Sequence, residues 1–169
     1  MNELAHTPIV KTLRWPDEDA TQAFAARLAA HPALRNVFIE LRGDLGAGKT
    51  TLVRHLLRAL GVTGRVKSPT YAVVEPYELP GAQGRDEPLN IWHFDFYRFQ
   101  DPRESDDAGF RDIFASPGLK LAEWPDKAAG FIPPADLVIQ LEVLQDESRQ
   151  VRLRAQTHSG RDLLQAVGP

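Results

Sequence analysis

Residues 43–50 of the chain read GDLGAGKT and match the pattern G-x-x-x-x-G-K-[ST]. A short apolar segment at 37–41 precedes the motif, and after Lys49 leucine and valine recur on one face of a helix. A strand, a glycine-rich loop and a helix in this order are the context in which such a motif binds phosphate. The sequence therefore predicts a strand at 37–41, a phosphate-binding loop, and a helix that ends at Gly61.

The chemistry of this loop suits a nucleotide with a bound metal ion. Glycines let consecutive backbone N–H groups converge on phosphate oxygens, and the positive end of the helix dipole adds to their attraction. Lys49 brings a point charge toward the β- and γ-phosphates, and the Thr50 hydroxyl is suited to ligate Mg²⁺. We therefore expect the nucleotide to contact Asp44, Leu45, Gly46, Ala47, Gly48, Lys49, Thr50 and Thr51.

Composition narrows the class of protein. The length of 169 residues fits one domain over residues 1–169, and the absence of cysteine excludes disulfides, thiolate zinc sites and cysteine nucleophiles. The formal net charge of −3 argues against a chain that grips nucleic acid by itself. We see neither a signal peptide nor an apolar run of about 18 residues, so we expect a cytoplasmic protein without membrane contact.

The remaining pattern alternates short strands and helices around the motif. This predicts an α/β fold of the P-loop NTPase type, with three layers and a central mixed, partly parallel sheet flanked by helices. The expected strands are 9–14, 72–79, 89–97, 118–123, 135–143 and 150–157, and the expected helices begin near Asp17 and cover parts of 103–114 and 161–167.

Two acidic residues end predicted strands. Asp95 shares one face of its strand with His93, opposite the aromatic residues that we expect in the core, and Glu123 closes the strand at 118–123. One carboxylate is needed on the metal side and another to activate water. Spacing does not separate these two roles, and a structural role for either residue stays open. The function of the loop at 65–71 is also left open by the sequence: it is either a γ-phosphate sensor or an ordinary polar turn.

A guanine-reading N-K-x-D motif is absent, so ATP is preferred over GTP. Three classes of protein remain: a slow ATPase that times an assembly, a P-loop small-molecule kinase, and a nucleotide-binding regulatory subunit without significant turnover. A kinase of this size should carry an arginine-rich lid, whereas the basic clusters of this chain are short and dispersed. That observation favours the ATPase over the kinase.

Four segments together resemble the TsaE family, also called YjeE, in their order and spacing. They are GDLGAGKTT (43–51), GRVKSPTY (64–71), HFDFYR (93–98) and LAEWPDK (121–127), within a similarity that runs from 13 to 143. The family is the bacterial ATPase required for the threonylcarbamoyladenosine (t6A) modification of tRNA. It usually has leucine where this chain has Phe96, a change on the core face without chemical effect.

The resemblance implies roles for particular residues and partners. Thr50 and Glu123 would hold Mg²⁺, Asp95 would be the acid needed for hydrolysis beside Lys49, and Thr70 would act from a switch-like loop. Trp124 would report or gate the state of the site. The implied partners are homologues of TsaD and TsaB, which would activate a weak ATPase and deal with the tRNA, so that this chain meets tRNA only indirectly and does not bind DNA.

Overall fold

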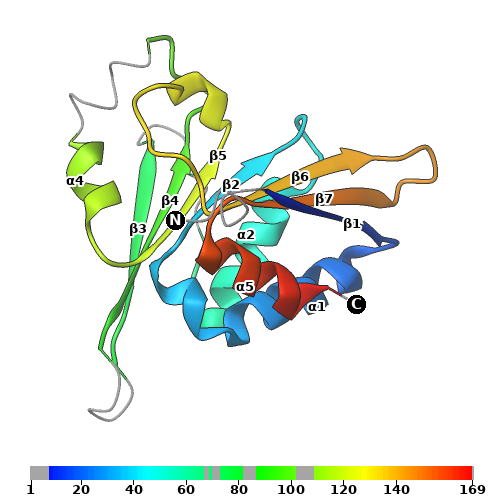
Figure 1. The fold of residues 1–169 in the computed structure, drawn as a ribbon, viewed down its shortest axis with the longest axis horizontal. Coiled ribbons are helices and arrows are strands. Elements are labelled where there is room, and N and C mark those ends of the chain that lie inside the picture. The colour runs from blue at the N-terminus through cyan, green and yellow to red at the C-terminus, as the bar shows by residue number, and fades with distance from the viewer. Residues whose placement is uncertain (1–7, 67–68, 70–72, 82–86, 102–108, 169) are drawn as a thin grey trace.

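The structure is a computed structural model that describes residues 8–66, 69, 73–81, 87–101 and 109–168. Figure 1 shows a twisted sheet with helices packed against it. The strands are β1 (Ile9–Trp15), β2 (Phe38–Arg42), β3 (Val74–Leu79), β4 (Leu89–Asp95), β5 (Leu119–Glu123), β6 (Leu137–Val143) and β7 (Arg149–Ala155). The helices are α1 (Glu18–Ala30), α2 (Lys49–Leu60), α4 (Phe110–Ala115) and α5 (His158–Val167), with the 3₁₀ turns η2 (Pro32–Asn36) and η3 (Pro125–Ala128).

The described strands form one seven-stranded sheet in the order β1-β7-β6-β2-β5-β4-β3. The four central strands β6, β2, β5 and β4 are parallel, and β3 pairs antiparallel with β4 at one side. At the other side β7 pairs antiparallel with β6, and β1 pairs antiparallel with β7. The predicted mixed α/β sheet is therefore confirmed. Parallel strands end at a common edge, so the carboxyl ends of β2, β5 and β4 face the same side of the molecule.

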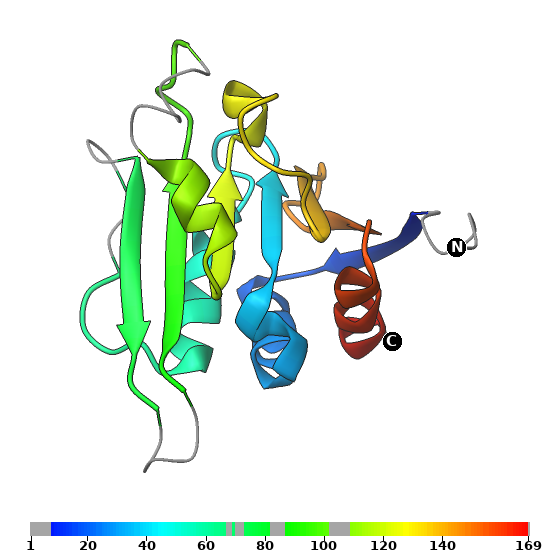
Figure 2. The same cartoon turned by 60° about the vertical axis from the view of Figure 1, so that its left-hand side comes forward.

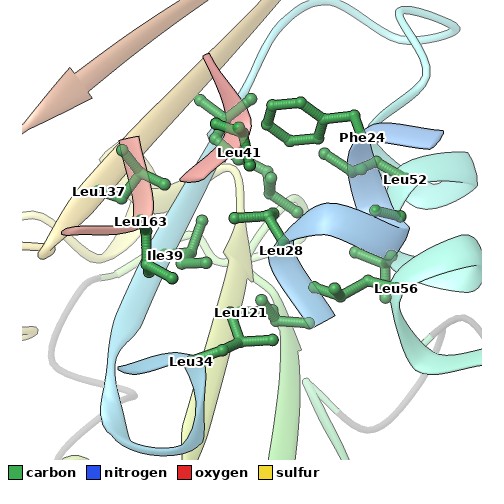
Figure 3. Close-up of a cluster of buried hydrophobic side chains, with 14 of the residues drawn as sticks. Phe24, Leu28, Leu34, Ile39, Leu41, Leu52, Leu56, Leu121, Leu137 and Leu163 are labelled. Atoms are coloured by element: carbon green, nitrogen blue, oxygen red, sulfur yellow. The ribbon is translucent and has the colours of Figure 1, made fainter. Parts of the chain in front are cut away.

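Helices cover the sheet on both faces, as the prediction of three layers requires. In Figure 2, α4 lies in front of β4 and β5, and α2 lies behind them. The larger core packs α1, α2 and α5 against the sheet, and Figure 3 shows Phe24 and Leu28 from α1 meeting Leu52 and Leu56 from α2. The smaller core holds Phe94 and other aromatic side chains beneath α4. None of the described helices is long and apolar enough to cross a bilayer.

Most element boundaries follow local signals in the sequence. The Asp17 side chain caps α1 by accepting a hydrogen bond from the backbone N–H of Ala20 at 3.0 Å. Gly61 ends α2 in the left-handed conformation, as predicted.

Among the described residues, four predicted boundaries are wrong by two residues or more. Strand β6 begins at Leu137 and not at 135, and strand β7 ends at Ala155 and not at 157. The last helix begins at His158 and not at 161, because the Thr157 hydroxyl accepts from the N–H of Gly160 and caps it. The fourth strand ends at Asp95 and not at 97, because the Asp95 carboxylate accepts from the Tyr97 N–H and turns the chain.

Candidate active site

The glycine-rich loop between β2 and α2 requires glycine at two positions. Gly43 has a φ of +144°, and a Cβ there would lie 2.6 Å from the carbonyl oxygen of Leu141. Gly48 has a φ of +110° and is the N-cap of α2. No side chain of the described residues caps this helix, and the N–H groups of a first helical turn have no partner within the helix. The loop therefore directs backbone donors and the positive end of the helix dipole into one concavity.

Lys49, the first residue of α2, is buried at the centre of this loop with 5% of its surface exposed. Its ammonium donates to the carbonyl oxygens of Gly43 and Asp44 and lies 3.9 Å from the centroid of the Trp124 ring. Burial lowers the pKa of Lys49, while the charges of Glu123, Asp95 and Asp44 oppose that shift. The cation is thus held inside the glycine-rich loop, and its contact with the phosphates of a nucleotide stays a prediction.

Thr50 and Glu123 are in direct contact across the edge of the sheet. The Thr50 hydroxyl lies 3.0 Å from Oε1 and 3.2 Å from Oε2 of Glu123. Glu123 is the last residue of β5 and is 3% exposed, because β5 lies in the parallel centre of the sheet. A third group, the His93 ring, contacts the same carboxylate from β4 at 2.6 Å.

Asp95 ends β4 opposite Glu123 in the pairing of β4 with β5. Its Oδ1 accepts from the Tyr97 N–H at 3.0 Å. Burial raises the pKa of Asp95, and the negative charge of Glu123 raises it further, against the opposing effects of the Tyr97 hydrogen bond, His93 and Lys49. Asp95 is therefore a more basic carboxylate than an ordinary aspartate, placed beside the glycine-rich loop.

One cleft of about 260 Å³ brings the predicted site residues together. Its lining contains all eight residues predicted for the nucleotide together with Asp95, Tyr97, Glu123, Trp124 and Arg149. The predicted catalytic residue Thr70 lies outside the described residues, as does most of its loop. The structure thus joins the loop to both carboxylates, and the roles of these residues stay predictions.

Arg149 is a lining residue that the sequence analysis missed. It begins β7, and its Nε donates to the carbonyl oxygen of Ala47 at 2.9 Å, so that it supports the loop from a strand two positions away from β2 in the sheet. A second, adjoining cavity of about 490 Å³ shares Arg149 with the cleft. It is lined by Trp15, Asp17, Glu18, Thr21, Gly46, Ala47, Gly48, Thr51, Val143, Glu147 and Arg149. No motif marks Arg149, because only the fold brings it to the loop.

The chain is similar to proteins of one family over most of its length. Residues 15–151 match the family described as "Threonylcarbamoyl adenosine biosynthesis protein TsaE". The tRNA threonylcarbamoyladenosine biosynthesis protein TsaE of Haemophilus influenzae is 42% identical over 130 residues, which cover 77% of each chain. Its namesake from Bacillus subtilis is 34% identical over 150 residues, which cover 86% of this chain and 87% of the relative.

The fold is similar to a solved structure as well. The crystal structure of Bacillus subtilis YdiB superposes with a TM-score of 0.74 and 25% sequence identity, over 96% of each chain. The resemblance drawn from the four sequence segments is therefore confirmed, and the matched region extends far enough to include Arg149. The chain belongs to the TsaE family.

Proposed function

We propose that this chain binds ATP with Mg²⁺ and hydrolyses it slowly, in the service of t6A synthesis on tRNA. The observation that carries the proposal is the meeting of Lys49, Glu123 and Asp95 in one cleft with the glycine-rich loop. The relatives' names, which specify tRNA threonylcarbamoyladenosine biosynthesis, support the biological setting. A cationic loop beside two carboxylates is the arrangement that phosphoryl transfer to water needs.

The donor set of the cleft fits Mg²⁺. Thr50 and Glu123 offer a hydroxyl and a carboxylate that are already in contact, and Mg²⁺ prefers such hard oxygen ligands. The described residues contain no cluster of three or more His, Asp or Glu side chains able to hold a metal ion. This agrees with Mg²⁺, which takes few ligands from the protein and the rest from phosphate and water. When bound, the ion would neutralise charge on the β- and γ-phosphate oxygens.

The contacts favour different roles for the two carboxylates, which sequence spacing left open. Glu123 is occupied by Thr50 and His93, so it suits the metal side of the site. The Asp95 carboxylate accepts a hydrogen bond from the backbone N–H of Tyr97, and its pKa is raised. A carboxylate with these properties suits the orientation of the attacking water and acceptance of its proton.

The cavity that adjoins the cleft is where we place the nucleoside. It shares Gly46, Ala47, Gly48 and Thr51 with the phosphate cleft, so a nucleotide whose phosphates fill the loop would extend into it. Its volume of about 490 Å³ lies within the usual range of ligand pockets, and Trp15 supplies an aromatic wall. The preference for adenine over guanine rests on the missing guanine-reading motif.

We infer that homologues of TsaD and TsaB are the partners and that the complex works in the cytoplasm. The net charge of −3 supports leaving the tRNA to those partners. Among the described residues, Arg149 is the arginine that lines the cleft, and its Nε already donates to the carbonyl of Ala47. An arginine that supports the loop in this way is a poor candidate for stabilising charge on the transferred phosphate. We therefore expect the isolated chain to be a weak ATPase that docking activates.

The test is release of phosphate at saturating ATP, with and without the TsaB–TsaD pair. We expect slow release alone and faster release with the pair, and Thr70→Ala should lose much of the stimulated rate while keeping the basal one. Equal rates in both conditions would favour a nucleotide-binding subunit without significant turnover. In a parallel assay with [γ-³²P]ATP and a metabolite extract, label on a small molecule instead of free phosphate would favour a kinase.

A further inference from the structure

His93 is a buried polar residue to which the proposed chemistry gives no role. It lies in β4 two residues before Asp95, on the strand face opposite Phe94, and is 1% exposed. A polar ring taken this far from water costs free energy unless its nitrogens find partners. Where those partners lie therefore indicates what the ring does.

The His93 ring makes its hydrogen bond to the Glu123 carboxylate. Nε2 lies 2.6 Å from Oε2 of Glu123, whereas Nδ1 has no hydrogen-bond partner among the described residues. Because an ionised carboxylate only accepts hydrogen bonds, the contact assigns the proton to Nε2. The ring thus donates to Glu123 from β4, while Thr50 contacts the same carboxylate from α2.

These two contacts fix the orientation of Glu123. Oε2 of the carboxylate accepts a charge-assisted hydrogen bond from His93. Oε1 is the carboxylate oxygen that lies nearer to the Thr50 hydroxyl. Without His93, the Glu123 side chain would keep one contact and could rotate about its last torsions, which have broad energy wells. Groups that hold a metal-site carboxylate in this way commonly change metal affinity by about 10-fold to 100-fold when they are removed.

We propose that His93 is a positioning residue, which holds the Glu123 carboxylate in the orientation that binds the metal ion of the nucleotide. The proposal rests on the proposed function, because it requires a metal–nucleotide complex in the cleft. It assigns His93 no contact with nucleotide or metal. Its effect should appear in metal affinity, with metal-free nucleotide affinity left nearly unchanged.

The test compares two amide replacements of the same ring. In His93→Gln, the side-chain N–H lies near the former position of Nε2 and can still donate to Glu123. In His93→Asn, which is one methylene shorter, the amide falls near the former Nδ1 and cannot reach Glu123. Both side chains are amides with the same polarity and the same hydrogen-bonding groups. They differ only in how far the amide extends from the backbone.

Two binding measurements are made on each folded protein, with folding checked by circular dichroism and thermal melting. Electron paramagnetic resonance counts free Mn²⁺ during titration into protein saturated with ADP, and calorimetry in EDTA measures ADP without metal. We expect His93→Asn to weaken Mn²⁺ binding about 10-fold or more and His93→Gln to stay within about threefold of the native protein. Metal-free ADP affinity should change less than about twofold in both, since His93 is not among the described residues that line the cleft.

Each outcome decides the proposal. Native Mn²⁺ affinity in His93→Asn, or equal losses in both variants, would overturn it, because a core position without a positioning role predicts no dependence on reach. If His93→Asn does not fold, His93→Gln decides: retained Mn²⁺ affinity supports the proposal, and a loss of about 10-fold or more overturns it. A native protein that binds no ADP would instead overturn the proposed function, which separates the two failures.

Discussion

Asp95 and Glu123 are paired residues at the ends of two neighbouring parallel strands, so each strand ends in a carboxylate at the same edge of the sheet. The pairing gives them different surroundings. Glu123 contacts Thr50 and His93, whereas Asp95 bends back to the Tyr97 backbone and has a raised pKa. In many active sites, two carboxylates in different environments take different catalytic roles.

The first prediction separates these two roles by substitution. Asp95→Asn should lower ATP turnover by about 100-fold or more and leave nucleotide affinity nearly unchanged, as expected for a group that acts in the transition state. Glu123→Gln should instead raise the Mg²⁺ concentration needed for nucleotide binding. Steady-state kinetics and calorimetry at several Mg²⁺ concentrations measure both effects. Exchanged phenotypes would show that the roles are assigned the wrong way round.

The second prediction concerns the pH dependence of the rate. If Asp95 accepts a proton, turnover must fall as the pH drops through its pKa in the folded protein, which lies above the ordinary value of 3.8. The acid limb of the profile should therefore appear at a higher pH than an unperturbed aspartate would give, and Asp95→Asn should abolish it. The measurement is kcat/KM for ATP against pH at a fixed excess of Mg²⁺, which reports the pKa of the free enzyme, with circular dichroism to confirm folding at each pH. An unchanged acid limb in the variant would assign it to another group.

The same shift gives a third prediction, on stability. Because folding raises the pKa of Asp95, the folded state binds the proton more tightly than the unfolded state. The free energy of unfolding therefore decreases as pH rises from 3.8 through the folded pKa, and the cost persists at neutral pH. Asp95→Asn removes this cost and keeps an acceptor for the Tyr97 N–H, so its Tm at pH 7 should equal or exceed that of the native protein. A Tm clearly below the native value would show that the carboxylate stabilises the fold.

The fold class was readable from the sequence because its signals are local. The motif at 43–50, the Asp17 cap and the Gly61 helix end each depend on neighbouring residues, and the structure agrees with all three. The start of the last helix at His158 was missed although its capping residue, Thr157, is also a local signal, because threonine is equally common at the end of a strand.

Part of the site could not be read in this way. Arg149 reaches Ala47 across 102 positions of sequence, and only the order of strands in the sheet brings them together. The contact of His93 with Glu123 likewise depends on the register between β4 and β5. Such contacts carry no fixed spacing, so a motif search does not detect them.

The fourth prediction tests the loop through Gly43. An alanine there would adopt a φ of +144° and place its Cβ 2.6 Å from the Leu141 carbonyl oxygen. We expect Gly43→Ala to lower the free energy of unfolding by about 2 kcal/mol or more and to weaken ADP binding, because the loop must shift. Gly130→Ala is the matched control: its φ of +84° is also unfavourable for alanine, but apart from its chain neighbours no atom of the described residues lies within 4 Å of the added Cβ. Its cost should be about 1 kcal/mol with native ADP affinity, measured by urea unfolding and calorimetry. Equal effects of the two variants would mean that backbone conformation alone matters at Gly43.

The last prediction concerns Arg149, which no motif identified. Its Nε–H donates to the Ala47 carbonyl, and its side chain lines both the cleft at the glycine-rich loop and the adjoining cavity. Loss of a hydrogen bond from a charged donor costs about 1.5–3 kcal/mol of stability, and a loop freed in this way must be re-ordered when ADP binds. Arg149→Ala should therefore weaken ADP binding, by up to about 10-fold if half of that cost is paid on binding. Arg149→Lys should bind ADP little better than Arg149→Ala does, since an ammonium lacks the planar guanidinium geometry. The control is Arg152→Ala, which removes the same charge from an exposed position of the same strand and should leave ADP affinity within about twofold. Calorimetry with ADP and Mg²⁺ measures all three variants. Equal losses in Arg149→Ala and Arg152→Ala would reduce the effect to net charge and remove Arg149 from the nucleotide site.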